Sequence, residues 1–82
     1  MDTEVIRSKI KEFISNAANI DSAKIADNAS YVNDLGLDSL TMLEISVDLE
    51  SEFDMEVPEE ELANLKTIQD SVNLVQKYLA AN

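Results

Sequence analysis

Glycine and proline occur only once each in these 82 residues, as Gly36 and Pro58. A fold built from β-strands needs many tight turns, and turns rely on these two residue types for their backbone angles. Apolar residues make up 45% of the chain, which is too many for a disordered segment. We therefore expect a helical protein that forms a single domain over residues 1–82.

Apolar side chains recur at helical spacing in three segments, residues 4–18, 39–53 and 67–80. A short helix is expected over residues 59–64, because Pro58 suits the start of a helical turn and the acids at 59–61 favour its positive end. Thr3 is the expected N-cap of the first helix and Asp38 that of the second, since both side chains can accept hydrogen bonds from backbone N–H groups. Thr67 and Asp70 have the spacing of a capping box at the start of the last helix. The predicted fold class is all-α: a small four-helix bundle with three long helices, one short helix and a long structured loop between the first and second helices.

Residues 19–37 form the longest connection and show no sustained helical or strand period. Loops of this length in a small domain are often functional rather than plain linkers. Asp21 and Ser22 can cap a single helical turn within the loop. We expect a packed loop that crosses one end of the bundle, anchored by Ile20, Ile25, Tyr31, Val32, Leu35 and Leu37.

The second helix has more apolar positions than one buried stripe needs. At 100° per residue, one stripe consists of Met42, Ile45, Leu49 and Phe53. A second stripe lies on nearly the opposite face, flanked by acids, and consists of Leu40, Leu43 and Val47. A helix in a small domain has one core to face, so the second stripe resembles a docking surface. The alternative is that both stripes are buried between neighbouring elements.

Negative charge is concentrated in the middle of the chain. The net charge is −11, from 17 acids and 6 bases, and no Lys or Arg occurs between Ile25 and Leu65. Such a charge distribution repels nucleic acid and anionic lipid and attracts basic protein surfaces. The alternative is a coat of charge that only keeps the protein in solution.

The missing residue types exclude several classes of chemistry. The chain has no cysteine and no histidine, so it lacks thiolate nucleophiles, cysteine-based zinc sites and the side chain most used for proton transfer near neutral pH. A single glycine cannot form a phosphate-binding glycine loop. We expect no catalytic residues, no specific metal site and no membrane span. The acidic start, Met-Asp-Thr-Glu-Val, is unlike a signal peptide, so we expect a cytoplasmic protein.

One side chain stands where another enzyme can modify it. Ser39 follows Asp38 at the start of the second helix, where the backbone N–H groups and the helix dipole favour an attached phosphate. The alternative is ordinary helix capping, which is the commoner role of an Asp-Ser pair at this position.

The run Asp34-Leu35-Gly36-Leu37-Asp38-Ser39-Leu40 resembles the modification motif of acyl carrier proteins. The resemblance covers most of the chain, because matching segments precede and follow this motif in the same order. They are Ala29-Ser30-Tyr31-Val32-Asn33, Glu44, Leu49-Glu50-Ser51-Glu52-Phe53-Asp54, Val57-Pro58 and Leu65-Lys66-Thr67-Ile68. Two positions depart from the family pattern: Ser51 stands where an acid is frequent, and Tyr31 stands where Phe is common.

The resemblance implies that Ser39 carries 4′-phosphopantetheine, transferred from coenzyme A by a phosphopantetheinyl transferase. The thiol of this group would then hold acyl chains as thioesters, which accounts for thiol chemistry in a protein without cysteine. It also implies that basic patches of acyltransferase, ketosynthase, reductase and dehydratase enzymes contact the second helix, at Asp38, Leu40, Glu44, Val47, Asp48 and Glu50.

Carriers of this family can hold the acyl chain inside the bundle, and the resemblance places such a pocket at matching positions. These are Tyr31, Ile45, Leu49, Val57, Leu62, Leu65, Ser71 and Leu74. The small side chain of Ser71 in an apolar neighbourhood could leave space there. The alternative, favoured for the unmodified protein, is a plain packed core.

The predicted function is that of a monomeric acyl carrier protein that takes growing acyl chains between the enzymes of fatty-acid biosynthesis. A carrier for polyketide synthesis or another specialised acyl pathway is an alternative with the same fold and serine. An acidic adaptor that binds basic partners through an unmodified surface is an alternative from a different class.

Overall fold

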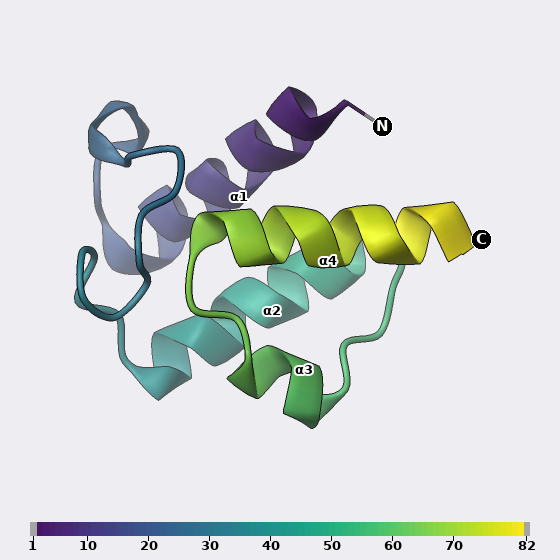
Figure 1. The fold of residues 1–82 in the computed structure, drawn as a ribbon. Helices are drawn as coiled ribbons and strands as arrows, with labels where there is room; N and C mark the ends of the chain where they lie inside the picture. Colours follow the sequence, from purple (N-terminus) through teal and green to yellow (C-terminus); the bar gives the residue numbers. More distant parts are fainter. Residues whose placement is uncertain (1, 82) are drawn as a thin grey trace.

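The computed structural model describes residues 2–81 as an all-helical bundle (Figure 1). Its elements, in chain order, are α1 (Thr3–Ala18), the short 3₁₀ helix η1 (Ser22–Lys24), α2 (Ser39–Phe53), α3 (Glu59–Ala63) and α4 (Ile68–Ala81). Helix α1 packs against both α2 and α4, and α2 also contacts α4. The predicted fold class is confirmed: three long helices, one short helix and a long loop between α1 and α2.

Helix α1 begins one residue earlier than predicted, and its N-cap is Asp2. The Asp2 carboxylate accepts a hydrogen bond of 2.9 Å from the Glu4 N–H, while Thr3 is already the first residue of the helix. Asp and Thr are both good N-caps, so the sequence alone could not separate two such residues that stand side by side. The helix buries Ile6, Ile10 and Ile14 completely.

Helix α4 begins with the predicted capping box. The Asp70 N–H donates to Oγ1 of Thr67 at 3.2 Å, and the Thr67 N–H donates to the Asp70 carboxylate at 3.1 Å. The core that α4 closes is apolar throughout except for Ser46 and Ser71. Its apolar members are Ile6, Ile10, Ile14, Ile25, Ala29, Tyr31, Leu37, Ile45, Leu49, Phe53, Met55, Ile68, Val72, Leu74 and Val75.

The loop between α1 and α2 crosses one end of the bundle (Figure 1). Asp21 caps η1, as predicted, by accepting a hydrogen bond of 3.0 Å from the Ala23 N–H. An isolated antiparallel bridge between Ser30 and Thr67 joins the loop to the segment before α4. The predicted anchors Ile25, Tyr31 and Leu37 are buried and Ile20 and Leu35 pack partly against the core. The prediction for Val32 was wrong, because its side chain is 65% exposed.

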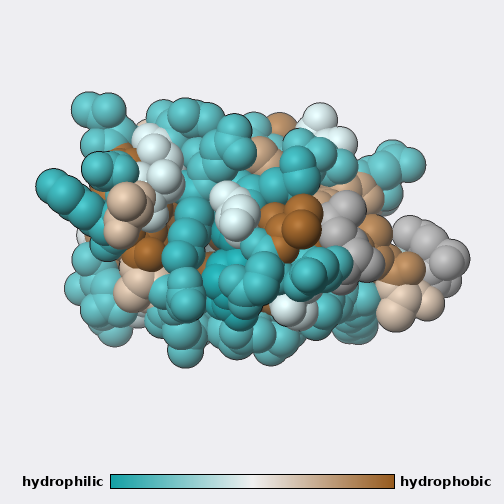
Figure 2. Space-filling view, turned by 90° about the horizontal axis from the view of Figure 1, so that it is seen from above, coloured by the Kyte–Doolittle hydropathy of each residue, from teal (hydrophilic) through white to brown (hydrophobic). Residues whose placement is uncertain are grey.

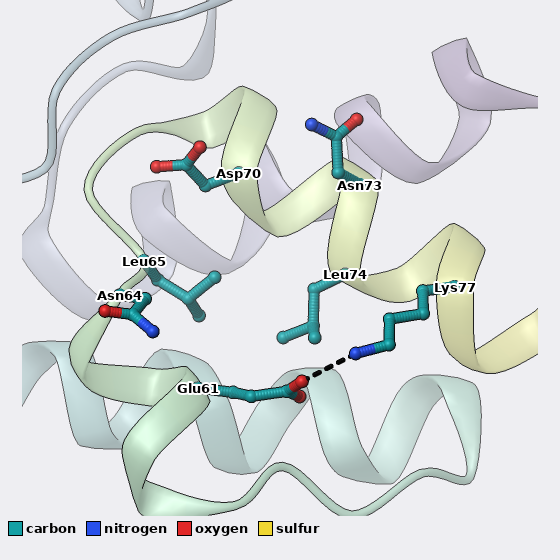
Figure 3. A pocket seen from close by; sticks show the side chains of 7 residues that line it. All are labelled: Glu61, Asn64, Leu65, Asp70, Asn73, Leu74 and Lys77. Carbon is teal, nitrogen blue, oxygen red and sulfur yellow. Dashed lines mark hydrogen bonds and ion pairs between the residues drawn. The ribbon is translucent and has the colours of Figure 1, made fainter.

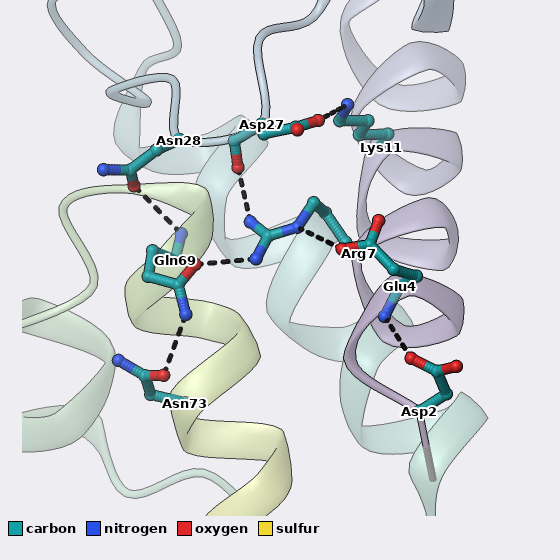
Figure 4. A network of polar contacts seen from close by, with 8 residues as sticks. All are labelled: Asp2, Glu4, Arg7, Lys11, Asp27, Asn28, Gln69 and Asn73. Carbon is teal, nitrogen blue, oxygen red and sulfur yellow. Dashed lines mark hydrogen bonds and ion pairs between the residues drawn. The ribbon is translucent and has the colours of Figure 1, made fainter.

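A network of polar contacts centred on Arg7 fixes the same loop to α1 and α4 (Figure 4). The Arg7 guanidinium donates to the backbone oxygen of Asp27 at 2.6 Å and to Oε1 of Gln69 at 2.7 Å. The Asn28 side chain accepts a hydrogen bond from the Gln69 N–H at 3.3 Å. A hydrogen bond from the Lys11 ammonium, 2.6 Å long, lowers the pKa of the Asp27 carboxyl. The loop that leads to α2 is therefore hydrogen-bonded to both α1 and α4.

Figure 2 shows the molecule from above, relative to the orientation in Figure 1. This face is mainly hydrophilic, with apolar atoms in small separate patches. Within residues 2–81, none of the helices has both the length and the apolar character needed to span a bilayer.

Candidate functional site

Ser39 is the first residue of α2, and its side chain is exposed. Asp38 is the N-cap of this helix, as predicted, and its carboxylate accepts a hydrogen bond of 2.8 Å from the Thr41 N–H. This hydrogen bond lowers the pKa of the Asp38 carboxyl. The backbone oxygen of Asp38 accepts from the Met42 N–H at 3.0 Å. The serine hydroxyl is thus presented to solvent from a rigid helix start.

A compact turn delivers the chain to Ser39. The Asp34 carboxylate accepts a hydrogen bond of 2.7 Å from the Ser30 N–H, and the Asp34 N–H donates to the Ser30 oxygen at 3.1 Å. Gly36 has a φ of 65°, in the left-handed region that residues with a side chain avoid, and its N–H donates to the Val32 oxygen at 3.1 Å. The one glycine of the chain therefore stands where the turn requires it.

A groove of about 700 Å³ opens beside the serine, between the turn, the start of α2 and α3. We name it the Ser39 groove. Much of its lining is apolar, and its charged members are Asp38, Glu59 and Lys66. The remaining lining residues are Ser30, Val32, Asn33, Leu37, Ser39, Met42, Leu43, Leu62, Ala63 and Leu65. A group attached to the Ser39 oxygen would therefore leave the helix next to a preformed groove.

The second apolar stripe of α2 is exposed, which confirms its separation from the core stripe. The exposed fractions are 65% for Leu40, 51% for Leu43 and 56% for Val47. The core stripe packs inward, with Ile45 and Leu49 each 1% exposed. The alternative in which both stripes are buried is therefore wrong.

Acidic side chains flank the exposed stripe unequally. Glu44 is exposed and lines a shallow hollow of about 460 Å³ between α1 and α2, together with Leu43, Val47 and Asp48. The carboxylate of Glu50 instead accepts a hydrogen bond of 3.4 Å from the Val57 N–H and is half-buried. The structure thus brings Leu40, Glu44, Val47 and Asp48 onto one face, with Asp38 at the start of the helix and Glu50 at the edge of this face.

The eight residues expected around an acyl chain do not share one cavity among those found in the described part of the chain. Tyr31, Ile45, Leu49, Ser71 and Leu74 belong to the packed core. The Tyr31 hydroxyl and Oγ of Ser71 form a buried hydrogen bond of 2.5 Å, so the space beside the small serine side chain is occupied. Leu62 and Leu65 line the Ser39 groove, and Val57 packs partly against the core.

A separate hollow of about 280 Å³ lies between α3 and α4 (Figure 3). Leu65 and Leu74 line it, and an ion pair of 2.8 Å between Glu61 and Lys77 stands at its edge. The hydrogen bond from Lys77 lowers the pKa of the Glu61 carboxyl, which also accepts a hydrogen bond from the Tyr78 hydroxyl. Two of the eight expected residues, Leu65 and Leu74, therefore line this hollow.

Several residues that lie beside Ser39 had not been predicted as site residues. Lys66, Glu59, Val32 and Asn33 line the Ser39 groove, although they lie outside the motif. The signal that was available for Lys66 is its position, since it is the first base after the base-free stretch of residues 25–65. Among residues 2–81, no three acidic side chains converge into a group that could hold a metal ion.

Comparison with known proteins gives concordant matches. The family model described as phosphopantetheine attachment site matches residues 8–75. An acyl carrier protein of Bdellovibrio bacteriovorus is 39% identical over 72 residues, which cover 88% of this chain and 92% of the relative. Those of Thermobifida fusca and Thermosynechococcus vestitus are 40% and 36% identical, over 83% and 99% of this chain and 86% and 100% of the relatives. The chain belongs to the acyl carrier protein family.

The prosthetic group of this acyl carrier is 4′-phosphopantetheine. The geometry around Ser39 fits such a group, because the serine is exposed and a groove of about 700 Å³ lies beside it. An attachment there displaces no side chain of the core, since Ser39 and its neighbours Asp38 and Leu40 are all exposed. The loop that leads to this helix start is fixed to α1 and α4 by the hydrogen bonds of Arg7.

Proposed function

We propose that Ser39 is the residue that carries 4′-phosphopantetheine. The observation that supports this assignment is the exposed serine at a helix start that Asp38 caps, directly beside the Ser39 groove. In the attachment, catalysed by a phosphopantetheinyl transferase, the Ser39 hydroxyl loses its proton and its oxygen bonds to phosphorus. The pyrophosphate bond of coenzyme A breaks between that phosphorus and the bridging oxygen, and adenosine 3′,5′-bisphosphate leaves. Once bound, the group supplies a terminal thiol that holds acyl chains as thioesters.

The partner surface of the proposal is the exposed stripe of α2 with its flanking acids. It consists of Asp38, Leu40, Glu44, Val47, Asp48 and Glu50. Support comes from the exposure of the apolar stripe and from the twelve acids and no bases in residues 25–65. A negative field speeds the approach of basic enzyme surfaces, while a small apolar contact keeps each complex short-lived. A carrier that visits several enzymes needs both properties.

The pathway of the proposal is fatty-acid biosynthesis, with acyltransferase, ketosynthase, reductase and dehydratase enzymes as partners in the cytoplasm. The carrier acts as a monomer that forms one domain over residues 1–82. It has no catalytic residue and serves as a substrate of these enzymes. The polyketide or other specialised pathway remains the second candidate, since it would use the same serine and the same fold.

The acyl chain, in this proposal, enters the bundle between α2 and the last two helices. The residues that would surround it are Tyr31, Ile45, Leu49, Val57, Leu62, Leu65, Ser71 and Leu74. The chain would enter at the hollow beside Leu65 and Leu74 or at the groove beside Leu62, because open space already exists there. The core side chains would have to move apart to admit a chain, because Ile45, Leu49 and Ser71 are buried.

Trial loading tests the proposed pathway. The modified protein is offered to a malonyl transferase of fatty-acid synthesis and to one of polyketide synthesis, and the rate of malonyl thioester formation is measured for each. We expect faster loading by the fatty-acid enzyme. Faster loading by the polyketide enzyme would replace the proposed pathway with polyketide synthesis, and loading by neither would point to another specialised acyl pathway.

A further inference from the structure

Lys66 is the one base that lines the Ser39 groove. Its backbone is firmly held, because its oxygen accepts a hydrogen bond of 3.0 Å from the Tyr31 N–H and its N–H donates to the Asp70 carboxylate at 2.9 Å. Its side chain is exposed and forms no ion pair among residues 2–81. Four of the other five bases do form such pairs: Arg7, Lys9, Lys11 and Lys77.

A phosphodiester on Ser39 would add a negative charge to a groove that already holds two acids, Asp38 and Glu59. At the start of α2, the Thr41 N–H is not available to the phosphate, because it already donates to the Asp38 carboxylate. Residues 25–65, which supply the rest of the groove, contain no Lys or Arg. Like charges placed together are destabilising unless a cation separates them. Lys66 is the cation that the groove supplies.

The rest of the groove matches the other parts of 4′-phosphopantetheine. After its phosphate, this group has a branched apolar dimethyl unit and then two amides. Val32, Met42 and Leu62 provide apolar lining for the dimethyl unit, and Ser30 and Asn33 provide polar groups for the amides. Val32 is 65% exposed, so its side chain is accessible to a group bound in the groove.

We propose that Lys66 pairs with the phosphodiester on Ser39 and thereby holds the first part of the 4′-phosphopantetheine arm in the Ser39 groove. This inference rests on the proposed attachment at Ser39. Lys66 acts as a positioning residue in it, since it orients the arm and takes no part in acyl transfer.

The test compares Lys66→Gln with Lys24→Gln. Lys24 is a matched control because it is also exposed, forms no ion pair among the described residues and lies in η1, outside the groove. Each protein is prepared unmodified and fully modified, with mass spectrometry to confirm the modification. Amide chemical shifts are then recorded by NMR for Val32, Met42 and Leu62, together with the ³¹P signal of the modified forms.

In the wild type and in Lys24→Gln, we expect modification to shift these three amide signals and give the same ³¹P position. In Lys66→Gln, the amide shifts should be smaller by about twofold or more, since one exposed ion pair changes a local equilibrium by about that factor. In the wild type, added salt should also reduce them, because salt screens the pair. Equal shifts in both variants, or shifts that salt leaves unchanged, would overturn the role of Lys66. A wild type that accepts no arm would instead refute the attachment at Ser39.

Discussion

The Tyr31 hydroxyl and the Ser71 hydroxyl form a buried hydrogen bond of 2.5 Å between the loop that precedes α2 and the first turn of α4. Both side chains are almost completely buried, with exposed fractions of 1% and 0%. The bond joins residues that lie 40 positions apart in the sequence. It places a polar pair in an otherwise apolar region that faces the expected path of an acyl chain.

Loss of either hydroxyl should destabilise the fold, because the partner hydroxyl is then left buried without a hydrogen bond. We expect Tyr31→Phe and Ser71→Ala each to lower the free energy of unfolding by about 1–3 kcal/mol. The double variant should cost less than the sum of the two, by about 1 kcal/mol. Urea unfolding measures all three values.

Ser46→Ala is the control for this pair. Ser46 is the other buried serine, and its hydroxyl donates within its own helix to the Leu43 oxygen at 2.7 Å. The effects of Ser46→Ala and Tyr31→Phe should therefore add. Additive effects for Tyr31→Phe and Ser71→Ala as well would contradict an energetic link between Tyr31 and Ser71.

Burial also predicts a loss of stability at alkaline pH. Burial raises the pKa of Tyr31 to about 12, although the hydrogen bond with Ser71 acts in the opposite direction. The folded state thus holds the proton more tightly than the unfolded state, whose tyrosine has a pKa of about 10. The stabilisation is complete below about pH 10 and is lost as the pH rises through about 12; it amounts to about 3 kcal/mol.

Urea midpoints between pH 8 and 12 measure this effect. The fall in the midpoint should be markedly smaller in Tyr31→Phe than in the wild type. Tyr78→Phe is the comparison, because Tyr78 is only half-buried and its pKa is raised by burial and by its bond to Glu61. A Tyr31→Phe protein that loses stability as steeply as the wild type would contradict the prediction.

The cap on α2 gives a prediction at acid pH. The hydrogen bond from the Thr41 N–H lowers the pKa of Asp38, so the carboxylate stabilises the fold above its unfolded pKa, near 3.8. This stabilisation is lost as the pH falls through the lower pKa of the folded state. Asp38→Ala should reduce the melting temperature by several degrees at pH 7, and the difference should shrink below about pH 4.

Asp38→Asn separates the charge from the cap. An asparagine side chain retains an oxygen that can accept a hydrogen bond from the Thr41 N–H. The melting temperature of Asp38→Asn at pH 7 should therefore be close to that of the wild type. If Asp38→Ala lowered the melting temperature by the same amount at pH 7 and at pH 3, the charge of Asp38 would have no role in the cap.

Charge reversal beside the exposed stripe should slow partner enzymes without changing the fold. Glu44 is exposed, and its side chain forms no ion pair or hydrogen bond within residues 2–81. Glu44→Lys should reduce the rate of acyl transfer about tenfold at low salt, because attraction to basic enzyme surfaces is lost. Glu12→Lys makes the same charge change at an exposed position of α1 and should have little effect. Equal rates for the two variants would refute a specific role for this face.

The helices and the two stripes of α2 could be predicted because they depend on local periodicity. Leu40, Leu43 and Val47 follow the helical repeat, so their common face is fixed once the helix is assigned. The N-cap of α1 was misplaced by one residue, because Asp2 and Thr3 differ in backbone angles that the sequence does not specify.

Contacts between distant segments could not be predicted in the same way. The bond between Tyr31 and Ser71 and the presence of Lys66 and Ser39 in one groove depend on how the loop lies over α3 and α4. Val32 was expected to anchor the loop because it is apolar, yet the turn around Gly36 leaves it on the surface of the groove. Tertiary packing, not local preference, decides each of these positions.

Intact-protein mass spectrometry can show directly whether the 4′-phosphopantetheine arm is attached at Ser39. The wild type, Ser39→Ala and Ser51→Ala are incubated with coenzyme A, Mg²⁺ and a phosphopantetheinyl transferase of broad specificity. Ser51 is an exposed serine of the same helix and serves as the matched control. We predict a mass gain of one phosphopantetheine in the wild type and in Ser51→Ala and none in Ser39→Ala. A gain in Ser39→Ala, or no gain in folded wild type with an active transferase, would contradict the account.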